Sequence, residues 1–108
     1  MKFIRKNMRG NWMVTEVHEV GERRRLTVRT CKRDSGSIDT VASVATRDPL
    51  DDRFLIHAVH KDFYKRIGSS RFRATSKAVE EHHVAMVEQA GGLETLKAEV
   101  LAYYAPRA

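Results

Sequence analysis

This chain has little cysteine, no long hydrophobic run and no apolar leader, and each shortage excludes a class of protein. A single cysteine, Cys31, rules out an internal disulfide and any zinc site built from several thiolates. The longest apolar run, FLIHAV at residues 54–59, is far too short to span a bilayer. The basic N-terminal segment MKFIRKNMRGNW lacks the apolar core of a secretory signal. We therefore expect a cytoplasmic protein with no membrane partner.

Positive charge is unevenly distributed along the chain. The 108 residues carry a formal net charge of +6, and their length fits one domain, residues 1–108. Residues 1–33 hold ten Lys and Arg against three Glu, whereas residues 78–108 have a net charge of −3. Five further cations occur between residues 65 and 77 without an acid. Such segregation is typical of proteins that bind a polyanion.

Residues 12–32 predict a β-hairpin with a two-residue turn at Gly21-Glu22, because glycine suits the first position of a type II′ turn. This turn places Val20 opposite Arg23, and it sorts the side chains into two faces. The expected core face carries Met13, Thr15, Val17, Leu26, Val28 and Thr30. The expected outer face carries Trp12, Val14, Glu16, His18, Arg23, Arg25 and Arg29.

Two elements are expected after the hairpin. Residues 38–46 favour a third strand, although their apolar positions also fit a helical stripe. Residues 48–68 give the strongest helix pattern, with Asp48 as N-cap and Pro49 at the first helical position. Gly68 is expected to end that helix.

Two shorter helices are expected near the C-terminus. One runs over residues 76–90 with Thr75 or Ser76 as its cap, and the other runs over residues 93–104 after Gly91-Gly92. The predicted fold class is α+β, because a run of strands precedes a run of helices. It comprises an N-terminal antiparallel β-hairpin or three-stranded sheet, then a long helix and two shorter C-terminal helices.

The order of these elements resembles a known architecture. A three-stranded sheet followed by a helix, with Trp12 and three arginines on its open face, is similar to AP2-type DNA-binding domains and to the arm domains of phage integrases. The resemblance covers about residues 11–67. It implies contacts with nucleic acid by Trp12, Arg23, Arg25 and Arg29, because a guanidinium can hold phosphate or the O6/N7 edge of guanine. Those domains have one helix, whereas this chain predicts two more. If helices cover the face instead, Trp12 belongs to the core.

A second basic cluster surrounds Phe72. Cations interleaved with an aromatic ring suit phosphate contact combined with base stacking, and a solvated loop with Phe72 in the core is the alternative. Together with the hairpin, this cluster completes the candidate residues for binding nucleic acid or a partner. They are Trp12, Arg23, Arg25, Arg29, Lys65, Arg71, Arg73 and Lys77.

The histidines and the cysteine do not form a recognisable catalytic or metal motif. Two predicted helices each carry two histidines without a carboxylate at a metal-binding offset; they are His57, His60, His82 and His83. His82 and His83 point about 100° apart on a helix, so at most one faces the core. No glycine-rich phosphate loop accompanies Cys31. We expect no enzyme, no metal and no cofactor.

Two functions remain open from the sequence. The first is a small regulatory module that binds DNA or RNA through the basic hairpin. The second is a non-catalytic interaction factor, of the kind encoded by phages and mobile elements, that binds an acidic host protein or a ribonucleoprotein. A homodimer is compatible with either. A polyanion and an acidic protein surface attract the same residues, so the sequence does not separate the two.

Overall fold

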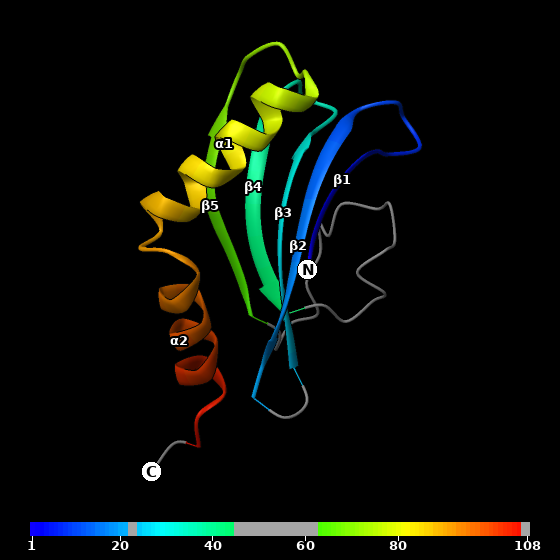
Figure 1. Ribbon diagram of the computed structural model, residues 1–108. Coiled ribbons are helices and arrows are strands. Elements are labelled where there is room, and N and C mark those ends of the chain that lie inside the picture. Colours follow the sequence, from blue (N-terminus) through cyan, green and yellow to red (C-terminus); the bar gives the residue numbers. More distant parts are fainter. Residues whose placement is uncertain (22–23, 45–62, 107–108) are drawn as a thin grey trace.

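The computed structural model describes residues 1–21, 24–44 and 63–106. Five antiparallel strands form one sheet in the order in which they occur along the chain, and two helices follow. The strands are β1 (Lys2–Lys6), β2 (Trp12–Val20), β3 (Arg24–Lys32), β4 (Ile38–Val44) and β5 (Tyr64–Ser70). The helices are α1 (Ser76–Gln89) and α2 (Leu93–Tyr104). Each strand therefore pairs with its neighbours in sequence, which makes the sheet a simple meander (Figure 1).

The predicted fold class is wrong in its elements, because the sheet has five strands and two helices follow it in the described residues. Most of the predicted long helix lies outside those residues, but its last part, from Tyr64 to Gly68, belongs to β5. Apolar residues here satisfy both helical and strand spacing, so periodicity alone does not separate the two. Gly68 ends no helix. A Cβ there would lie 2.5 Å from Met86 Sδ, so the glycine permits close packing of α1 on β5.

The predicted register of the hairpin is wrong by one residue. Val20 pairs with Arg24, so the connection contains three residues instead of two. It begins at Gly21, whose φ of +68° favours glycine. A slip of one residue moves every side chain of β3 to the other face relative to β2. Leu26 and Val28 therefore share a face with Val20, and Arg25 and Arg29 lie on the opposite face.

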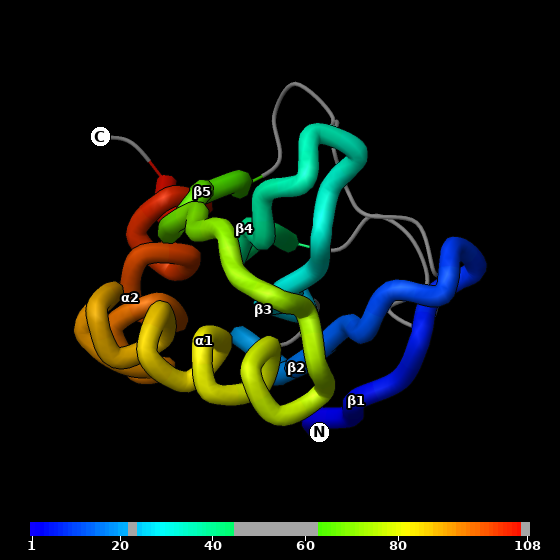
Figure 2. Tube along the Cα trace, turned by 90° about the horizontal axis from the view of Figure 1, so that it is seen from above, coloured from blue at the N-terminus to red at the C-terminus, as the bar shows by residue number. Residues whose placement is uncertain are grey.

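Both helices lie on one side of the sheet (Figure 2). The main hydrophobic core lies beneath them and consists of Val20, Leu26, Val28, Ala42, Phe63, Leu96 and Val100. The opposite face of the central strands is also buried, but it is more polar. Its buried residues include Thr15, Thr27, Arg29, Asp39 and Ser43. Side chains on both faces of β3 and β4 are therefore shielded from water.

Three predicted elements are confirmed. Residues 38–44 form strand β4, and the two C-terminal helices lie where the sequence predicts them. Thr75 caps α1 by accepting a hydrogen bond from the backbone N–H of Ala78 at 3.1 Å. Gly91 and Gly92 separate the helices with φ angles of +96° and +92°. No helix in the described residues is long and apolar enough to cross a membrane.

Candidate nucleic-acid interface

The structure does not bring Trp12 and the hairpin arginines to one surface. Trp12 lies on the face that the helices cover, and Arg25 and Arg29 lie on the other. Arg29 is only 4% exposed, and its Nε donates to Thr15 Oγ1 at 3.2 Å. Arg23 lies outside the described residues. The predicted outer face fails because the register slips by one and because both faces of β3 are buried.

Two further candidates are neutralised within the chain. Arg25 Nε donates to Glu19 Oε1 at 3.0 Å on the neighbouring strand. Lys65 Nζ donates to both carboxylate oxygens of Glu99 in α2, each at 2.9 Å. Lys65 therefore fastens α2 to the edge strand β5, which is a structural role.

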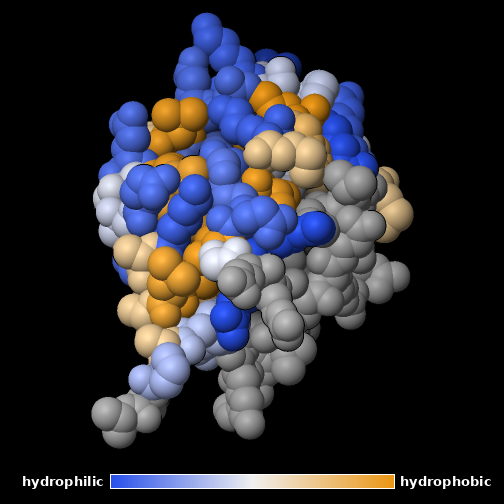
Figure 3. All heavy atoms as spheres, turned by 60° about the horizontal axis from the view of Figure 1, so that its bottom comes forward, coloured by the Kyte–Doolittle hydropathy of each residue, from blue (hydrophilic) through white to orange (hydrophobic). Residues whose placement is uncertain are grey.

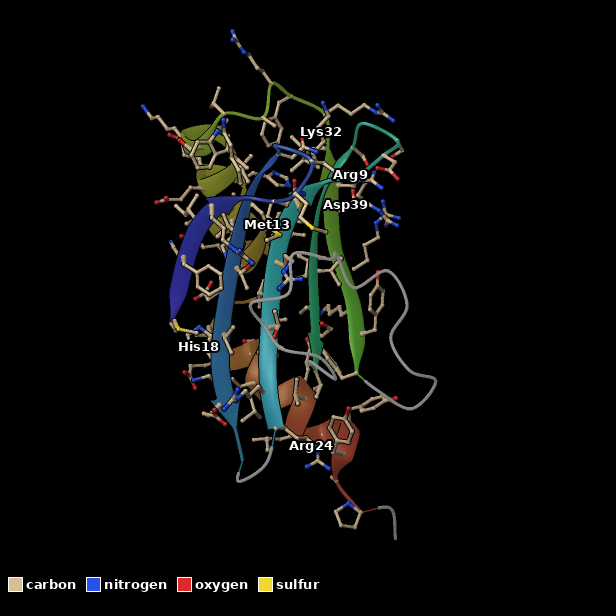
Figure 4. The ribbon with its side chains drawn as sticks, turned by 90° about the vertical axis from the view of Figure 1, so that its right-hand side faces the viewer. Arg9, Met13, His18, Arg24, Lys32 and Asp39 are labelled. Carbon is tan, nitrogen blue, oxygen red and sulfur yellow. The ribbon has the colours of Figure 1, made fainter. Side chains whose placement is uncertain are left out.

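The remaining candidates gather at one end of the sheet. There the β1–β2 turn, the β3–β4 turn and the connector to α1 come together, at the top of Figure 1. We call this region the basic end; its cations are Lys6, Arg9, Lys32, Arg33, Arg66, Arg71, Arg73 and Lys77. Arg9, Lys32 and Asp39 lie near one another here, and Arg24 lies at the far end (Figure 4). In the described residues, the ion pairs of these eight cations involve three acids, Asp34, Asp39 and Glu81, so positive charge is in excess here.

Asp39 organises the centre of the basic end. Its carboxylate is fully buried, and its Oδ2 accepts from Arg33 Nη1 and from Arg66 Nη2, each at 3.2 Å. Ser69 Oγ donates to Oδ1 at 2.6 Å. Burial alone raises the pKa of Asp39, but hydrogen bonds from Ser69, Ser37 and Arg33 and the nearby charge of Arg66 outweigh it and lower that pKa. Asp39 is therefore ionised at neutral pH and fixes two guanidinium groups in place.

Arg71 joins this cluster from the connector that precedes α1. Its Nη1 lies 3.0 Å from the position that a Cβ on Gly36 would occupy, so the guanidinium rests against the β3–β4 turn. Gly36 has a φ of +90°, which other residues rarely adopt. Arg33, Arg66 and Arg71 thus converge from three segments. Arg66 is 53% exposed, and Arg71 has no carboxylate partner in the described residues, so this cluster can attract an anion from solvent.

The rim of the basic end is more exposed. Arg9 forms an ion pair with Asp34 across two turns, and both side chains are largely in water. Lys6 Nζ lies 5.3 Å from the centre of the Trp12 ring, which leaves the half-buried Trp12 beside the cations. Arg71 and Arg73 have no carboxylate partner within the described ranges. Of the eight predicted site residues, Trp12, Arg71, Arg73 and Lys77 lie here.

The sequence prediction missed Arg9, Arg33, Asp39 and Arg66. The turn signal Asp34-Ser35-Gly36 placed Arg33 beside a reversal, but no local pattern shows which other segments meet there. Arg66 was hidden because it fell within the predicted helix 48–68. Only the meander brings β4 and β5 side by side and sets Arg66 next to Asp39.

The buried histidine belongs to a structural network. His83 is 1% exposed and links α1 to the sheet: its Nδ1 lies 2.8 Å from Thr30 Oγ1, and its Nε2 lies 2.8 Å from Glu16 Oε1. The network continues on both sides, because Thr40 hydrogen-bonds to Thr30 and His18 hydrogen-bonds to Glu16. Burial lowers the pKa of His83, so a neutral ring accepts from Thr30 and donates to Glu16.

Among the described residues, the other reactive side chains form no site, and His57 and His60 lie outside those residues. Asn7 donates to the buried Cys31 Sγ at 3.3 Å, and burial raises the pKa of that thiol. The residues that the structure describes contain no group of His, Cys, Asp and Glu that could hold a metal ion.

Comparison with protein-family models, curated proteins and solved structures gives no match. The five strands and two helices also differ from the three strands and one helix that the resemblance to AP2-type domains implies. The interpretation of the basic end therefore rests on its own geometry.

Proposed function

We propose that this protein is a small nucleic-acid-binding module that contacts the phosphate backbone through its basic end. The observation that carries the proposal is that the buried Asp39 carboxylate holds Arg33 and Arg66, while Arg71 lies against the neighbouring β3–β4 turn. A guanidinium held by Asp39 loses less conformational freedom when it binds phosphate, because its orientation is already fixed.

Backbone contact fits these residues better than base reading does. Most of the cations lie on turns and element ends, and no helix or strand pair that the structure describes presents a row of them to a groove. Phosphate contacts of this kind give sequence-independent affinity with a strong salt dependence. An acidic protein surface carries the same sign of charge at lower density. An acidic polypeptide is therefore included in the test for comparison with nucleic acid.

The test compares two variants that remove equal charge. The first carries Arg71→Gln, Arg73→Gln and Lys77→Gln at the basic end. The control carries Arg24→Gln, Arg25→Gln and Lys97→Gln, which lie away from it. Fluorescence anisotropy with labelled duplex DNA, single-stranded DNA, RNA and polyglutamate is measured over a range of salt concentrations.

We expect duplex binding by the native protein, with the slope of log K against log salt reduced by about two to three in the first variant, since each phosphate contact contributes about 0.9. The control should keep most of the slope. No anisotropy change at roughly 100 μM protein in low salt would overturn the proposal, because non-specific binding has Kd values of about 10⁻⁴ to 10⁻⁶ M. Binding to polyglutamate as tight as binding to duplex would instead favour an acidic protein partner.

A further inference from the structure

A groove runs between the edge strand β1 and helix α1; it adjoins the basic end and shares Trp12 and Lys77 with it. Its volume is about 770 Å³. Ile4, Trp12 and Val84 form its apolar floor, and Glu80, Glu81 and Glu88 of α1 form its rim. Val84 is 42% exposed, which is high for a valine facing a sheet. The groove is therefore apolar at its base and acidic along one wall.

Within the described part of the chain, strand β1 offers backbone groups without a strand partner beside this groove. In the described residues it has β2 as its neighbour on one side only. Met1 and Val17 exchange two backbone hydrogen bonds, at 2.8 and 3.0 Å, so the odd-numbered residues of β1 point their N–H and C=O groups toward β2. The N–H and C=O groups of Lys2, Ile4 and Lys6 consequently point to the free edge.

The side chains of these three residues share one face of the sheet, and Ile4 lines the groove. Lys2, Ile4 and Lys6 pair with Glu16, Val14 and Trp12 on β2, and Glu16 contacts His83 of α1. The free edge therefore carries an apolar side chain between two lysines, on the helix-covered side of the sheet. Lys2 and Lys6 form no ion pair within the described part of the chain, and neither do Glu80 and Glu88.

We propose that the free edge of β1 pairs with strand β1 of a second copy of this chain, which forms a two-fold symmetric dimer with a continuous sheet beside the groove. Antiparallel pairing centred on Ile4 uses the outward N–H and C=O groups of both strands. It places Ile4 of the partner subunit beside Ile4 over the apolar floor. Three lysines and three glutamates from each copy then balance one another around it: Lys2, Lys6, Lys77, Glu80, Glu81 and Glu88.

The glutamates are essential to this arrangement. Lysine on an edge strand normally prevents edge-to-edge pairing, and the proposed register sets Lys2 opposite Lys6 of the partner subunit. Such like-charged pairs are unfavourable unless anions lie close to them. The acidic wall of α1 supplies those anions, which is why we choose a second β1 over a strand of another composition.

The test is sedimentation equilibrium of the full chain without nucleic acid, from about 1 μM to 1 mM. The native protein should dimerise. Ile4→Pro removes an outward N–H, as proline can at a strand edge, and should give a monomer, whereas Ile4→Ala keeps the N–H and should still dimerise more weakly. Circular dichroism checks that each variant is folded.

A charge exchange tests the surface independently of the backbone. Glu80→Lys with Glu88→Lys should abolish the dimer, and adding Lys2→Glu with Lys6→Glu should restore it at least in part. Glu94→Lys on exposed α2 is the matched control and should not alter association. If Ile4→Pro does not fold, the charge exchange decides. The proposal is overturned if the native protein remains monomeric at 1 mM. It is also overturned if the variant with Glu80→Lys and Glu88→Lys dimerises like the native protein.

Discussion

Asp39 is the residue on which the geometry of the basic end depends. It is fully buried, and four neighbours donate hydrogen bonds or lend positive charge to it: Ser37, Ser69, Arg33 and Arg66. Removing its charge would take away the carboxylate that both guanidiniums share. Both are partly exposed, so water would reduce the cost of this loss.

We predict that Asp39→Asn lowers the free energy of unfolding by about 1–3 kcal/mol at pH 7. The pKa of Asp39 is lower in the folded chain than its ordinary value of 3.8, so the unfolded state takes up the proton first as the pH falls. The stabilisation by Asp39 is therefore complete above that value and is lost as the pH falls below it. Urea unfolding of both proteins at pH 7 and pH 3 measures this, and the difference should shrink at pH 3. An equal difference at both pH values contradicts the assignment.

Single residues show how far the sequence could predict this site. The cation-rich segments 1–33 and 65–77 are evident from composition, and both contribute to the basic end. Composition does not show which residues of these segments belong to the site. Arg29 looks like any surface arginine in the sequence, yet it is buried, because its strand lies in the middle of a sheet that is covered on both faces. Partners such as Asp39 and Arg66 are 27 residues apart and meet only through tertiary structure.

At the scale of elements, local signals predicted the helices better than the strands. Thr75 and the Gly91-Gly92 pair mark helix ends through backbone chemistry that operates locally, and both positions are correct. Strand register depends on the length of a turn, and an error of one residue at Gly21 exchanged two faces. The cap and stripe signals of residues 48–68 were equally local, yet Tyr64–Ser70 joins a sheet.

The contact between β5 and α1 provides a test of element packing. Gly68 sits where the helix approaches the strand, against Met86 Sδ. We predict that Gly68→Ala destabilises the fold by about 1–3 kcal/mol, because the new methyl group overlaps that sulfur. The loss of stability is limited because the flexible Met86 side chain can move away from the new methyl group.

A double-mutant cycle isolates this contact. Met86→Ala removes the atom that the new methyl group meets, so Gly68→Ala should cost much less in the Met86→Ala background, as measured by thermal or urea unfolding. Equal costs in both backgrounds would show that Gly68 is required for its backbone and not for the space it leaves.

At the scale of the whole molecule, the two ends of the sheet carry different side chains. The basic end occupies one end of the sheet. The opposite end, which comes forward in Figure 3, mixes apolar and polar side chains. Leu101 and Tyr103 are exposed there, and the Arg24 guanidinium lies 3.9 Å from the centre of the Tyr104 ring. An anion approaching this protein therefore meets a field that orients it toward one end.

The order of the strands also constrains how the chain folds. Every strand pairs with its sequence neighbours, so the sheet can grow by successive hairpins, each with a modest loop-closure cost. The helices reach the sheet through distant contacts, such as His83 with Glu16, 67 residues apart. We therefore expect the sheet to be largely formed in the transition state and the helices to dock afterward.

Two buried residues test this order by stopped-flow kinetics. Val28→Ala in the central strand should mainly slow folding, whereas Leu96→Ala in α2 should mainly accelerate unfolding. Each should cost about 1–4 kcal/mol at equilibrium, which is enough to assign the effect to one rate. The reverse pattern would show that the helices nucleate the fold. A late-docking α1 would mean that the acidic wall beside β1 forms last, so β1 edges can meet during folding before the anions that offset their lysines are in place.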